Sequence, residues 1–295
     1  MDHASTARST SQPAPPRNRR DDRRDVDVRW LLPWHQLRRA VREPERLRRL
    51  HRASVLASLR SLGEPTERRF LADCLGVDGP MLERFEADLV EDVEFVREIE
   101  RRHLEVRKTS IRLLGGAGAA DHDRCHRLLY HCTRALRPAV VVETGVFDGF
   151  SSAFLLKALR DNGQGRLCSI DFPARSAVPA STDKMLFDRL PVGADPGWIV
   201  PEGLRSRWEL RLGASRDVLG PWLAELGTID LFFHDSLHSF ENMTWEYAAA
   251  WPALSQGGLL LSDDVFWSRA FRRFAREVGG GERVFRGMGF LRKPA

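Results

Sequence analysis

The stretch VVVETGVFDGFSS, residues Val140 to Ser152, decides the fold because a buried strand, a glycine-rich turn and a helix start follow one another in it without interruption. Three β-branched residues before an acid are typical of a fully buried parallel strand. Gly145 and Gly149 permit a tight turn with close ligand approach, and Ser151 or Ser152 can cap the following helix. The pattern E-x-G-x-x-x-G differs from the G-x-G-x-x-G fingerprint of dinucleotide sites. The stretch predicts a loop that binds a nucleotide-type cofactor.

Strand and helix patterns alternate after this stretch, which predicts a doubly wound α/β fold with a mostly parallel sheet covered by helices on both faces. The expected strands that carry these patterns are 139–143, RLCSID (166–171), WELRL (208–212), IDLFFH (229–234) and GGLLLS (257–262), with a helix at 150–160. The segment ERVFRGMGFLRK (282–293) predicts two short antiparallel strands that complete a seven-stranded sheet. The stretch 172–206 is rich in Pro and Gly and predicts a lid with a helix near 182–190.

The first part of the chain divides into a tail and a helical extension. Residues 1–29 are mainly Ser, Thr, Pro, Arg and Asp, so we expect a disordered tail. A transit peptide is the alternative, but such peptides avoid acids, and this segment contains Asp21, Asp22, Asp25 and Asp27. Apolar residues at helical spacing predict a helical extension over 30–120, and the α/β domain then spans 121–295.

Two helices of this extension have clear sequence signals. A short helix is expected from about Pro65 to Gly76, and a longer one from Pro80 through Leu104, whose apolar residues form one stripe. The stripe indicates packing against the neighbouring domain; a dimerisation arm, and hence a homo-oligomer, or a wall of the substrate pocket is the alternative. The loop GGAGA (115–119) is typical of a linker.

Composition excludes several classes of protein. Hydrophobic residues make up 42% of the 295 residues, enough for a packed core, yet no apolar run approaches the roughly 20 residues of a membrane span. The start of the chain has no hydrophobic segment of signal-peptide type, and we expect a cytoplasmic protein without membrane partners. The four cysteines contain no C-x-x-C pair, which is consistent with a reducing compartment and predicts no disulfide.

The sequence gives only weak support for nucleic-acid binding and for zinc binding. The net charge is +5, but the arginines alternate with acids along the expected helices, so nucleic acid is an improbable partner. The segment DHDRCHRLLYHC (121–132) places His122 and His126 one helical turn apart, with two cysteines nearby. Its leucines show helical periodicity and its ligand candidates point in several directions, which favours a packed helix over a zinc site.

Acidic residues occur at the ends of four expected strands, where open α/β sheets bind ligands. They are Glu143, Asp171, Asp235, and the pair Asp263 and Asp264. A single acid at such a position can simply cap a helix, but five on one edge indicate a site. Asp171 at the second strand is suited to the two hydroxyls of a ribose. The three carboxylates after the fourth and fifth strands would repel one another unless a hard cation such as Mg²⁺ or Ca²⁺ lies among them.

Together these segments resemble the class I S-adenosylmethionine-dependent methyltransferases, and within them the metal-dependent small-molecule O-methyltransferases. The resemblance covers roughly 138–292. It is carried by motifs that match the cofactor loop, the ribose-binding strand end, the adenine-lining segment and the last two strand ends of the catechol O-methyltransferase type: VVETGVFDGFSS, SIDFP, GASRDVL (213–219), IDLFFHDSLHSF and GGLLLSDDVFW. The resemblance implies S-adenosylmethionine as cofactor and Mg²⁺ or another divalent cation as a helper.

Roles for individual residues follow from the resemblance. The residues implied to contact the cofactor are Glu143, Gly145, Phe147, Gly149, Ser151, Asp171, Ser215, Arg216 and Asp235, and those implied to bind the metal are Asp235, Asp263 and Asp264. Asp264 stands where the catechol enzymes have Asn. His238 stands where they have a lysine base, and in this it is similar to the macrolide sugar O-methyltransferases.

The implied chemistry is coherent. Methyl transfer needs a positioned donor and acceptor, and His238, with an ordinary pKa near 6.5, can take the proton of the acceptor hydroxyl. The alternative for His238 is a surface or capping role, and His234 is expected to be a strand residue with at most an indirect role. We predict a metal-assisted O-methyltransferase acting on a small hydroxylated molecule, such as a sugar or polyketide-type natural product. The rivals are a metal-independent enzyme acting on RNA or another macromolecule, and a non-catalytic relative of the same fold.

Overall fold

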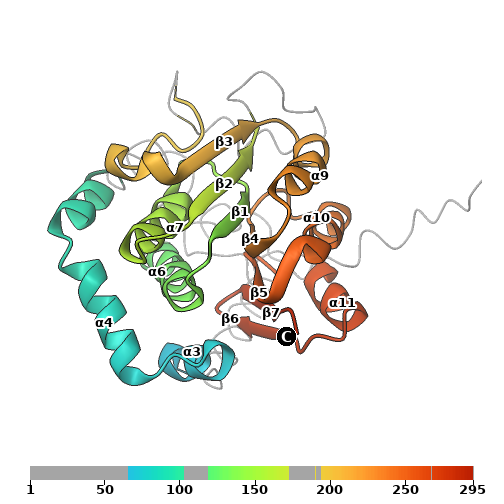
Figure 1. Cartoon of the computed structure of the whole chain (residues 1–295), viewed down its shortest axis with the longest axis horizontal. Helices are drawn as coiled ribbons and strands as arrows, with labels where there is room; N and C mark the ends of the chain where they lie inside the picture. Colours follow the sequence, from blue (N-terminus) through green and yellow to red (C-terminus); the bar gives the residue numbers. More distant parts are fainter. Residues whose placement is uncertain (1–65, 103–118, 173–189, 191–193, 267, 295) are drawn as a thin grey trace, which may run out of the picture.

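The computed structural model describes residues 66–102, 119–172, 190, 194–266 and 268–294, with side chains described from residue 125 onward in the helix that begins at 119. Its centre is a seven-stranded sheet in the order β3-β2-β1-β4-β5-β7-β6 (Figure 1). The strands are β1 (Val140–Thr144), β2 (Arg166–Asp171), β3 (Trp208–Leu212), β4 (Ile229–His234), β5 (Leu254–Ser262), β6 (Arg283–Phe285) and β7 (Met288–Arg292). The first five are parallel, and β7 pairs antiparallel with β5 and β6. The predicted fold and strand count are confirmed.

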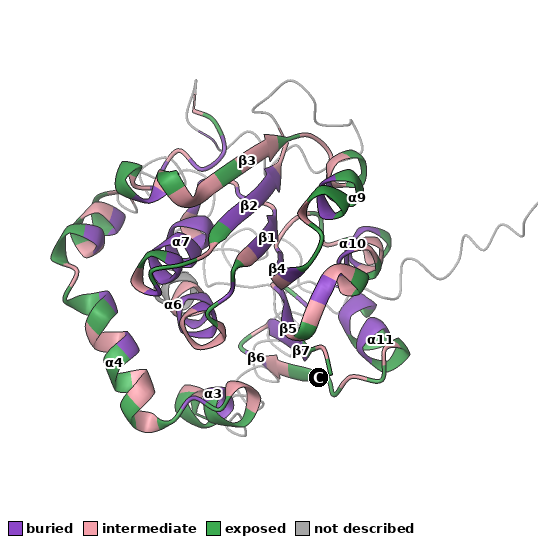
Figure 2. Cartoon of the chain, viewed as in Figure 1, coloured by how far each residue is buried: buried purple, intermediate pink, exposed green. Residues whose placement is uncertain are grey.

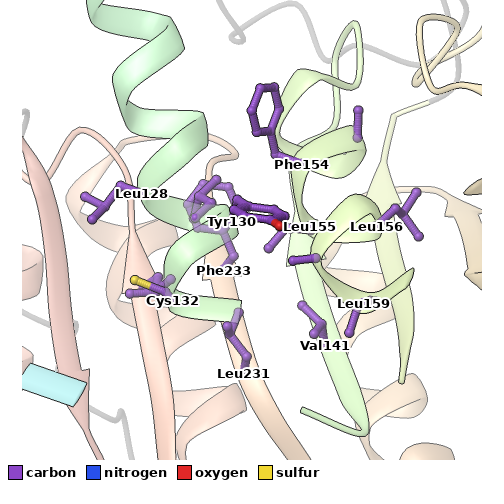
Figure 3. Close-up of a cluster of buried hydrophobic side chains, with 14 of the residues drawn as sticks. Leu128, Tyr130, Cys132, Val141, Phe154, Leu155, Leu156, Leu159, Leu231 and Phe233 are labelled. Carbon is purple, nitrogen blue, oxygen red and sulfur yellow. The ribbon is translucent and has the colours of Figure 1, made fainter. Parts of the chain in front are cut away.

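Helices cover both faces of this sheet (Figure 1). One face carries α6 (Ala119–Leu136) and α7 (Phe150–Asp161), and the other carries α9 (Ser215–Leu226), α10 (Phe240–Ala253) and α11 (Ala270–Glu277). A 3₁₀ helix, η2 (Glu202–Arg207), leads into β3. Alternation along the strands explains the two cores. Val141 and Phe233 face α6 and α7 (Figure 3). Val142 and Phe232 face α9 and α10. The central strands are therefore buried on both faces (Figure 2).

Strand register brings the carboxyl ends of the central strands into one row. Ile170, Thr144, His234 and Ser262 pair in sequence across β2, β1, β4 and β5. The hydrogen bonds continue one residue further: the N–H groups of residues 145, 235 and 263 donate to the carbonyls of the neighbouring strands at 2.8–2.9 Å. The next residue of each strand therefore stands in a second row, at the edge where ligands bind in such sheets.

The extension differs from the prediction at one point. The short helix α3 (Glu67–Leu75) ends at Gly76 in the left-handed conformation, as predicted. The predicted long helix from Pro80 through Leu104 is wrong, because α4 (Gly79–Val90) ends after Val90 and a separate helical segment starts at residue 93. The Asp92 carboxylate accepts a hydrogen bond from the Phe95 N–H (3.0 Å), so this acid starts a new helix instead of lying within one.

The described helices of the extension pack directly on the sheet domain. His131 of α6 is buried between two carboxylates, with Nδ1 3.0 Å from Glu67 of α3 and Nε2 3.0 Å from Glu86 of α4. Phe70 of α3 stacks on Phe285, with ring centroids 4.8 Å apart. This part of the extension therefore shares one core with α6, α7 and the antiparallel strands. The division at residue 120 stays a prediction.

Some predictions lie outside the described residues. These are the tail (1–29), the first helices of the extension, most of the GGAGA linker and the helix near 182–190. Of the described helices, none is long and apolar enough to cross a bilayer. All four cysteines, which lie at positions 74, 125, 132 and 168, are free thiols.

Candidate active site

The second row of the sheet edge gathers the acids that the sequence singled out. Asp171, Gly145, Asp235 and Asp263 stand side by side at the ends of β2, β1, β4 and β5. Glu143 lies two residues before Gly145, one step further inside the sheet. The predicted convergence on one edge is therefore present, and the acids differ in what surrounds each of them.

Glu143 is completely buried beneath the start of α7. Its carboxylate accepts hydrogen bonds from the hydroxyls of Ser151 (2.6 Å), Ser152 (2.6 Å) and Ser169 (2.7 Å). Burial raises the pKa of Glu143 to about 7, although the three hydroxyls oppose that rise. The prediction that Ser151 or Ser152 caps the helix is wrong: Gly149 is the N-cap residue, no side chain caps α7, and both hydroxyls bind Glu143 instead.

Asp171 fixes the glycine-rich loop from the β2 side. Its Oδ2 accepts hydrogen bonds from the N–H groups of Val146 (2.9 Å) and Phe147 (2.6 Å), and its Oδ1 accepts one from Phe172 N–H (2.6 Å). Burial raises the pKa of Asp171, and these backbone donors limit the rise. The carboxylate therefore shapes the loop.

The loop itself is held in an unusual conformation. Gly145, Phe147 and Gly149 have φ angles of 87°, 50° and 99°, and Phe147 is a non-glycine residue in the left-handed region. A β-carbon at position 145 would overlap the main-chain carbonyl of Asp235. The loop after β1 and the loop after β4 are therefore in backbone contact, which only glycine allows.

Like charges surround the acids after β4 and β5. Burial, and then repulsion from Asp263 and Asp264, raises the pKa of Asp235 well above its ordinary value. Burial and repulsion from Asp264 raise the pKa of Asp263 to about 7. Asp264 is exposed and has a φ of 51°, also in the left-handed region. This corner of the edge stores unfavourable electrostatic energy and backbone strain together.

His238 lies beside this acidic corner. Its Nε2 is 3.7 Å from Oδ1 of Asp235, and its side chain is largely buried. Burial and the nearby His234 lower the pKa of His238 to about 3. His238 is therefore neutral at physiological pH, the form that can accept a proton.

Ser215 and Arg216 begin α9 next to α10. The Ser215 hydroxyl hydrogen-bonds Glu246. The exposed Arg216 lies over the ring of Trp245 at 5.1 Å and donates to the carbonyl of Glu241 at 3.5 Å. These residues lie on the α10 side of the edge, across the sheet from the buried Glu143.

Glu246 of α10 is a residue that sequence reasoning missed. It is completely buried, and its carboxylate accepts hydrogen bonds from Thr144 Oγ1 (2.5 Å), Ser236 Oγ (2.8 Å) and Asn242 Nδ2 (3.0 Å) and contacts His234 Nδ1 (2.7 Å). Burial alone would raise its pKa, but the attraction of His234 and these donors lower it to about 2. The sequence does hold a signal, because Glu246 lies three residues after Met243 and four before Ala250 on the buried face of α10.

The residues predicted to bind a metal are not gathered into a metal site in the described part of the chain. In the part of the chain that the structure describes, no three His, Cys, Asp or Glu side chains are gathered closely enough to hold a metal ion. Asp235, Asp263 and Asp264 therefore do not form a ready metal site. On α6, His126 stacks on Phe150 and Phe154 and Cys132 belongs to the core, while the side chain of His122 lies outside the described residues.

Part of the α/β domain is similar to a known family of domains. Residues 142–265 match the model of a methyltransferase domain family, a span of less than half of the chain. This match and the strand order agree with the prediction of a class I S-adenosylmethionine-dependent methyltransferase. No curated protein sequence matches the chain.

Solved structures similar to this chain are distant. The O-methyltransferase TomG from Streptomyces achromogenes, in complex with SAM, is 18% identical over 65% of this chain and 88% of its own, with a TM-score of 0.44. A methyltransferase from Geobacter sulfurreducens is 21% identical over 68% of this chain and 89% of its own, with a TM-score of 0.45. The O-methyltransferase NovP is 17% identical over 59% of this chain and 80% of its own, also with a TM-score of 0.45. The fold assignment rests on the strand order and not on these similarities.

Proposed function

We propose that the chain transfers a methyl group from S-adenosylmethionine to a hydroxyl of a small molecule, such as a sugar or polyketide-type natural product. The observation that supports this most is the backbone contact between Gly145 and Asp235. This contact joins the glycine-rich loop to Asp235 in the acidic corner, and Asp235 is three residues before His238 in the chain. A donor loop and a proton acceptor therefore share one edge of the sheet.

The residues after β1 fit the methionine end of the cofactor. No side chain caps α7, so the N–H groups of its first turn suit the methionine carboxylate. Gly145, Phe147 and Gly149 let the backbone approach a ligand closely. Glu143 has no exposed surface. We therefore assign it an indirect role, in which it orients the hydroxyl of Ser151 (2.6 Å).

The nucleoside end is assigned to the neighbouring strands. Asp171 Oδ1 accepts a hydrogen bond from the N–H of Phe172, and a carboxylate oxygen can accept a second, so a ribose hydroxyl is chemically suited to it. Ser215, Arg216 and Asp235 are assigned to the adenine side and the methyl-bearing centre. Ser215 and Arg216 lie at the start of α9, and Asp235 follows β4 on the same sheet edge as Asp171.

The chemistry requires little from the protein beyond position and proton removal. S-adenosylmethionine, when bound, supplies the methyl group that the acceptor oxygen takes in an in-line displacement. Neutral His238 accepts the hydroxyl proton as the carbon–oxygen bond forms. The Asp235 carboxylate, 3.7 Å from Nε2, stabilises the positive charge that the imidazole then carries. The low pKa of His238 makes it a weak base before the acceptor binds.

Assistance by a divalent cation is the finer part of the proposal. Repulsion among Asp235, Asp263 and Asp264 is what a hard cation would relieve. Because the side chains are not gathered into a metal site, no catalytic step is assigned to a metal. Chelation with EDTA followed by return of Mg²⁺ tests this part: activity that survives EDTA would exclude the cation.

Two measurements test the proposal as a whole. Isothermal titration calorimetry should detect binding of S-adenosylmethionine to the full chain, and no binding would overturn the proposal. Transfer of labelled methyl from the cofactor should then be screened over sugars, polyketides and RNA. His238→Ala should bind the cofactor normally and lose about 10²-fold or more in methyl transfer. Unchanged turnover in that variant would remove the base assignment, and RNA as the preferred acceptor would favour the rival activity.

Cytoplasmic location and a homo-oligomeric state stay predictions from the sequence. Size-exclusion chromatography with light scattering measures the second directly.

A further inference from the structure

The glycine-rich loop needs support from outside its own sequence. Phe147, with φ of 50°, lies between two glycines that also have positive φ. Non-glycine residues adopt this conformation at a cost and keep it only when surrounding structure holds them there. Asp171 binds the loop from the β2 side through the N–H groups of Val146 and Phe147. That leaves the opposite side of the turn, where the chain passes from Phe147 into α7.

A distant segment, residues 197–199, holds that opposite side. Gly197 N–H donates to the carbonyl of Phe147 (2.8 Å), and Ile199 N–H donates to the carbonyl of Asp148 (3.1 Å). The indole Nε1 of Trp198 donates to Oδ1 of Asp148 at 2.6 Å. A β-carbon on Gly149 would be 2.7 Å from Cα of Gly197, so the two backbones are in direct contact.

The buried side chain of Asp148 joins the loop to residues 197–199 through its hydrogen bond with Trp198. Only 5% of Asp148 is exposed. Burial raises its pKa to about 6, and the Trp198 hydrogen bond opposes that rise. An acid removed from water at a turn is costly unless it is bonded. The indole N–H is a donor only, so it can satisfy a carboxylate without offering a competing acceptor.

The segment is in turn fixed to the site. Gly197 lies against the ring of Trp208, where a β-carbon would overlap the indole. Trp208 Nε1 donates to Ser169 Oγ (2.9 Å), and Ser169 Oγ donates to Glu143 (2.7 Å). Arg205 adds a hydrogen bond to the carbonyl of Gly197 (2.9 Å). A continuous set of contacts therefore leads from Glu143 around to the far side of the loop.

We propose that Trp198 and Asp148 are positioning residues for the methyl donor: the hydrogen bond between them holds Phe147 and Gly149 in the conformation that receives the cofactor. This inference rests on the proposed function, because it takes the loop to be the donor site. Neither residue needs to touch the cofactor. Their effect is on the fraction of molecules in which the loop is ready to bind, and hence on affinity.

Calorimetry with S-adenosylmethionine tests the pair without knowledge of the acceptor. Trp198→Phe removes the N–H donor, and Asp148→Ala removes the acceptor; each should weaken binding about tenfold, the size expected for one hydrogen bond to a charged group. Asp148→Asn keeps an acceptor oxygen and should bind within about threefold of the wild type. The double variant should be no weaker than either single variant, because both remove the same bond.

The control is Trp251→Phe in α10, whose ring packs on Phe274 in the other core and should leave binding unchanged. Melting temperatures of all variants should stay within a few degrees of the wild type.

Wild-type affinity in Trp198→Phe, or no difference between Asp148→Ala and Asp148→Asn, would overturn the inference. The inference would also be overturned if every variant that loses affinity also shows a large drop in melting temperature. If Trp198→Phe failed to fold, the two Asp148 variants would decide alone. Absence of binding by the wild type would instead overturn the proposed function.

Discussion

Glu246 and Asp263 are acids at the same edge of the sheet, yet their pKa values are displaced in opposite directions. Glu246 is buried with His234 and several hydrogen-bond donors, and its pKa falls to about 2. Asp263 is half-buried next to Asp264, and its pKa rises to about 7. The comparison shows that lying near the ligand-binding edge, whether on helix α10 or after strand β5, does not define the role of an acid. The groups around it decide whether it stabilises the fold or is held at a cost.

Removing Glu246 should have the largest effect on stability. Glu246→Ala leaves His234, Thr144 and Ser236 without their buried partner, and breaking such a pair costs about 3–5 kcal/mol. Urea denaturation measures this as a lower midpoint with an unchanged slope. Glu241→Ala, at an exposed position of the same helix, is the control and should change stability by less than about 1 kcal/mol. Equal effects of the two variants would contradict the central role of Glu246.

Asp148 is intermediate between Glu246 and Asp263, because its hydrogen-bond partner, Trp198, is neutral. The pH dependence of stability should reveal its raised pKa. Its folded pKa is about 6, above an unfolded value near 3.9. Between these values the folded state binds more protons than the unfolded state, so this carboxyl makes stability fall as pH rises from about 4 to 6, and has no further effect above that window.

Asp148→Asn should remove that component. The difference in unfolding free energy between Asp148→Asn and the wild type should shift by about 2 kcal/mol in favour of the variant between pH 4 and pH 7. Urea titrations at intervals of one pH unit measure it. A difference that does not vary with pH would show that Asp148 has an ordinary pKa.

Neutralising Asp263 should stabilise the protein. Asp263→Asn removes repulsion with Asp264 and Asp235 while keeping an oxygen acceptor, so unfolding at pH 8 should cost about 1 kcal/mol more than in the wild type. Methyl transfer should fall at the same time. The exposed Asp217→Asn of α9 is the matched control and should change neither quantity appreciably. A destabilised Asp263→Asn would mean that this acid has favourable partners, as Glu246 does.

The smallest effect should come from one donor to Glu246. Ser236→Ala removes a single hydroxyl (2.8 Å) and should lower stability by about 1 kcal/mol, since Glu246 keeps its other donors. Ser255→Ala, whose hydroxyl donates to Asp230 at the opposite edge, provides the comparison in the same urea experiment. A loss as large as that of Glu246→Ala would show that Ser236, and not His234, carries the interaction.

Much of the α/β domain could be predicted from the sequence, since the central strands β1, β2, β4 and β5 contain buried apolar residues and end at or next to an acid or glycine. The strands 166–171, 208–212 and 229–234 have the predicted bounds, and β5 begins three residues earlier than expected. The break between α4 and the segment at 93 was missed because a stripe of apolar residues continues across it. Asp92 could equally lie on the polar face of one helix or start another.

The position of the acids at one sheet edge could be predicted, but the contacts that each of them makes could not. Strand ends at one edge follow from topology, so the meeting of Asp171, Asp235 and Asp263 could be foreseen. Glu246 was not, because an acid in a helix is usually solvated, and its burial depends on His234 from another element. Asp148 and Trp198 are 50 residues apart, and no periodicity connects them. Contacts of this kind depend on tertiary structure that a single sequence does not encode as a pattern.

Gly145 has a consequence for engineering. Because the loop after β1 touches the carbonyl of Asp235 through backbone alone, main-chain atoms set the spacing between the donor loop and the β4 corner. Side chains that line the acceptor side can then be exchanged without moving the donor. On the proposed assignment, a library aimed at new acceptors can vary Leu237, an exposed residue beside His238, while position 145 is kept as glycine. Every variant in the library then keeps the spacing between the donor loop and the β4 corner, and selection acts only on the choice of acceptor.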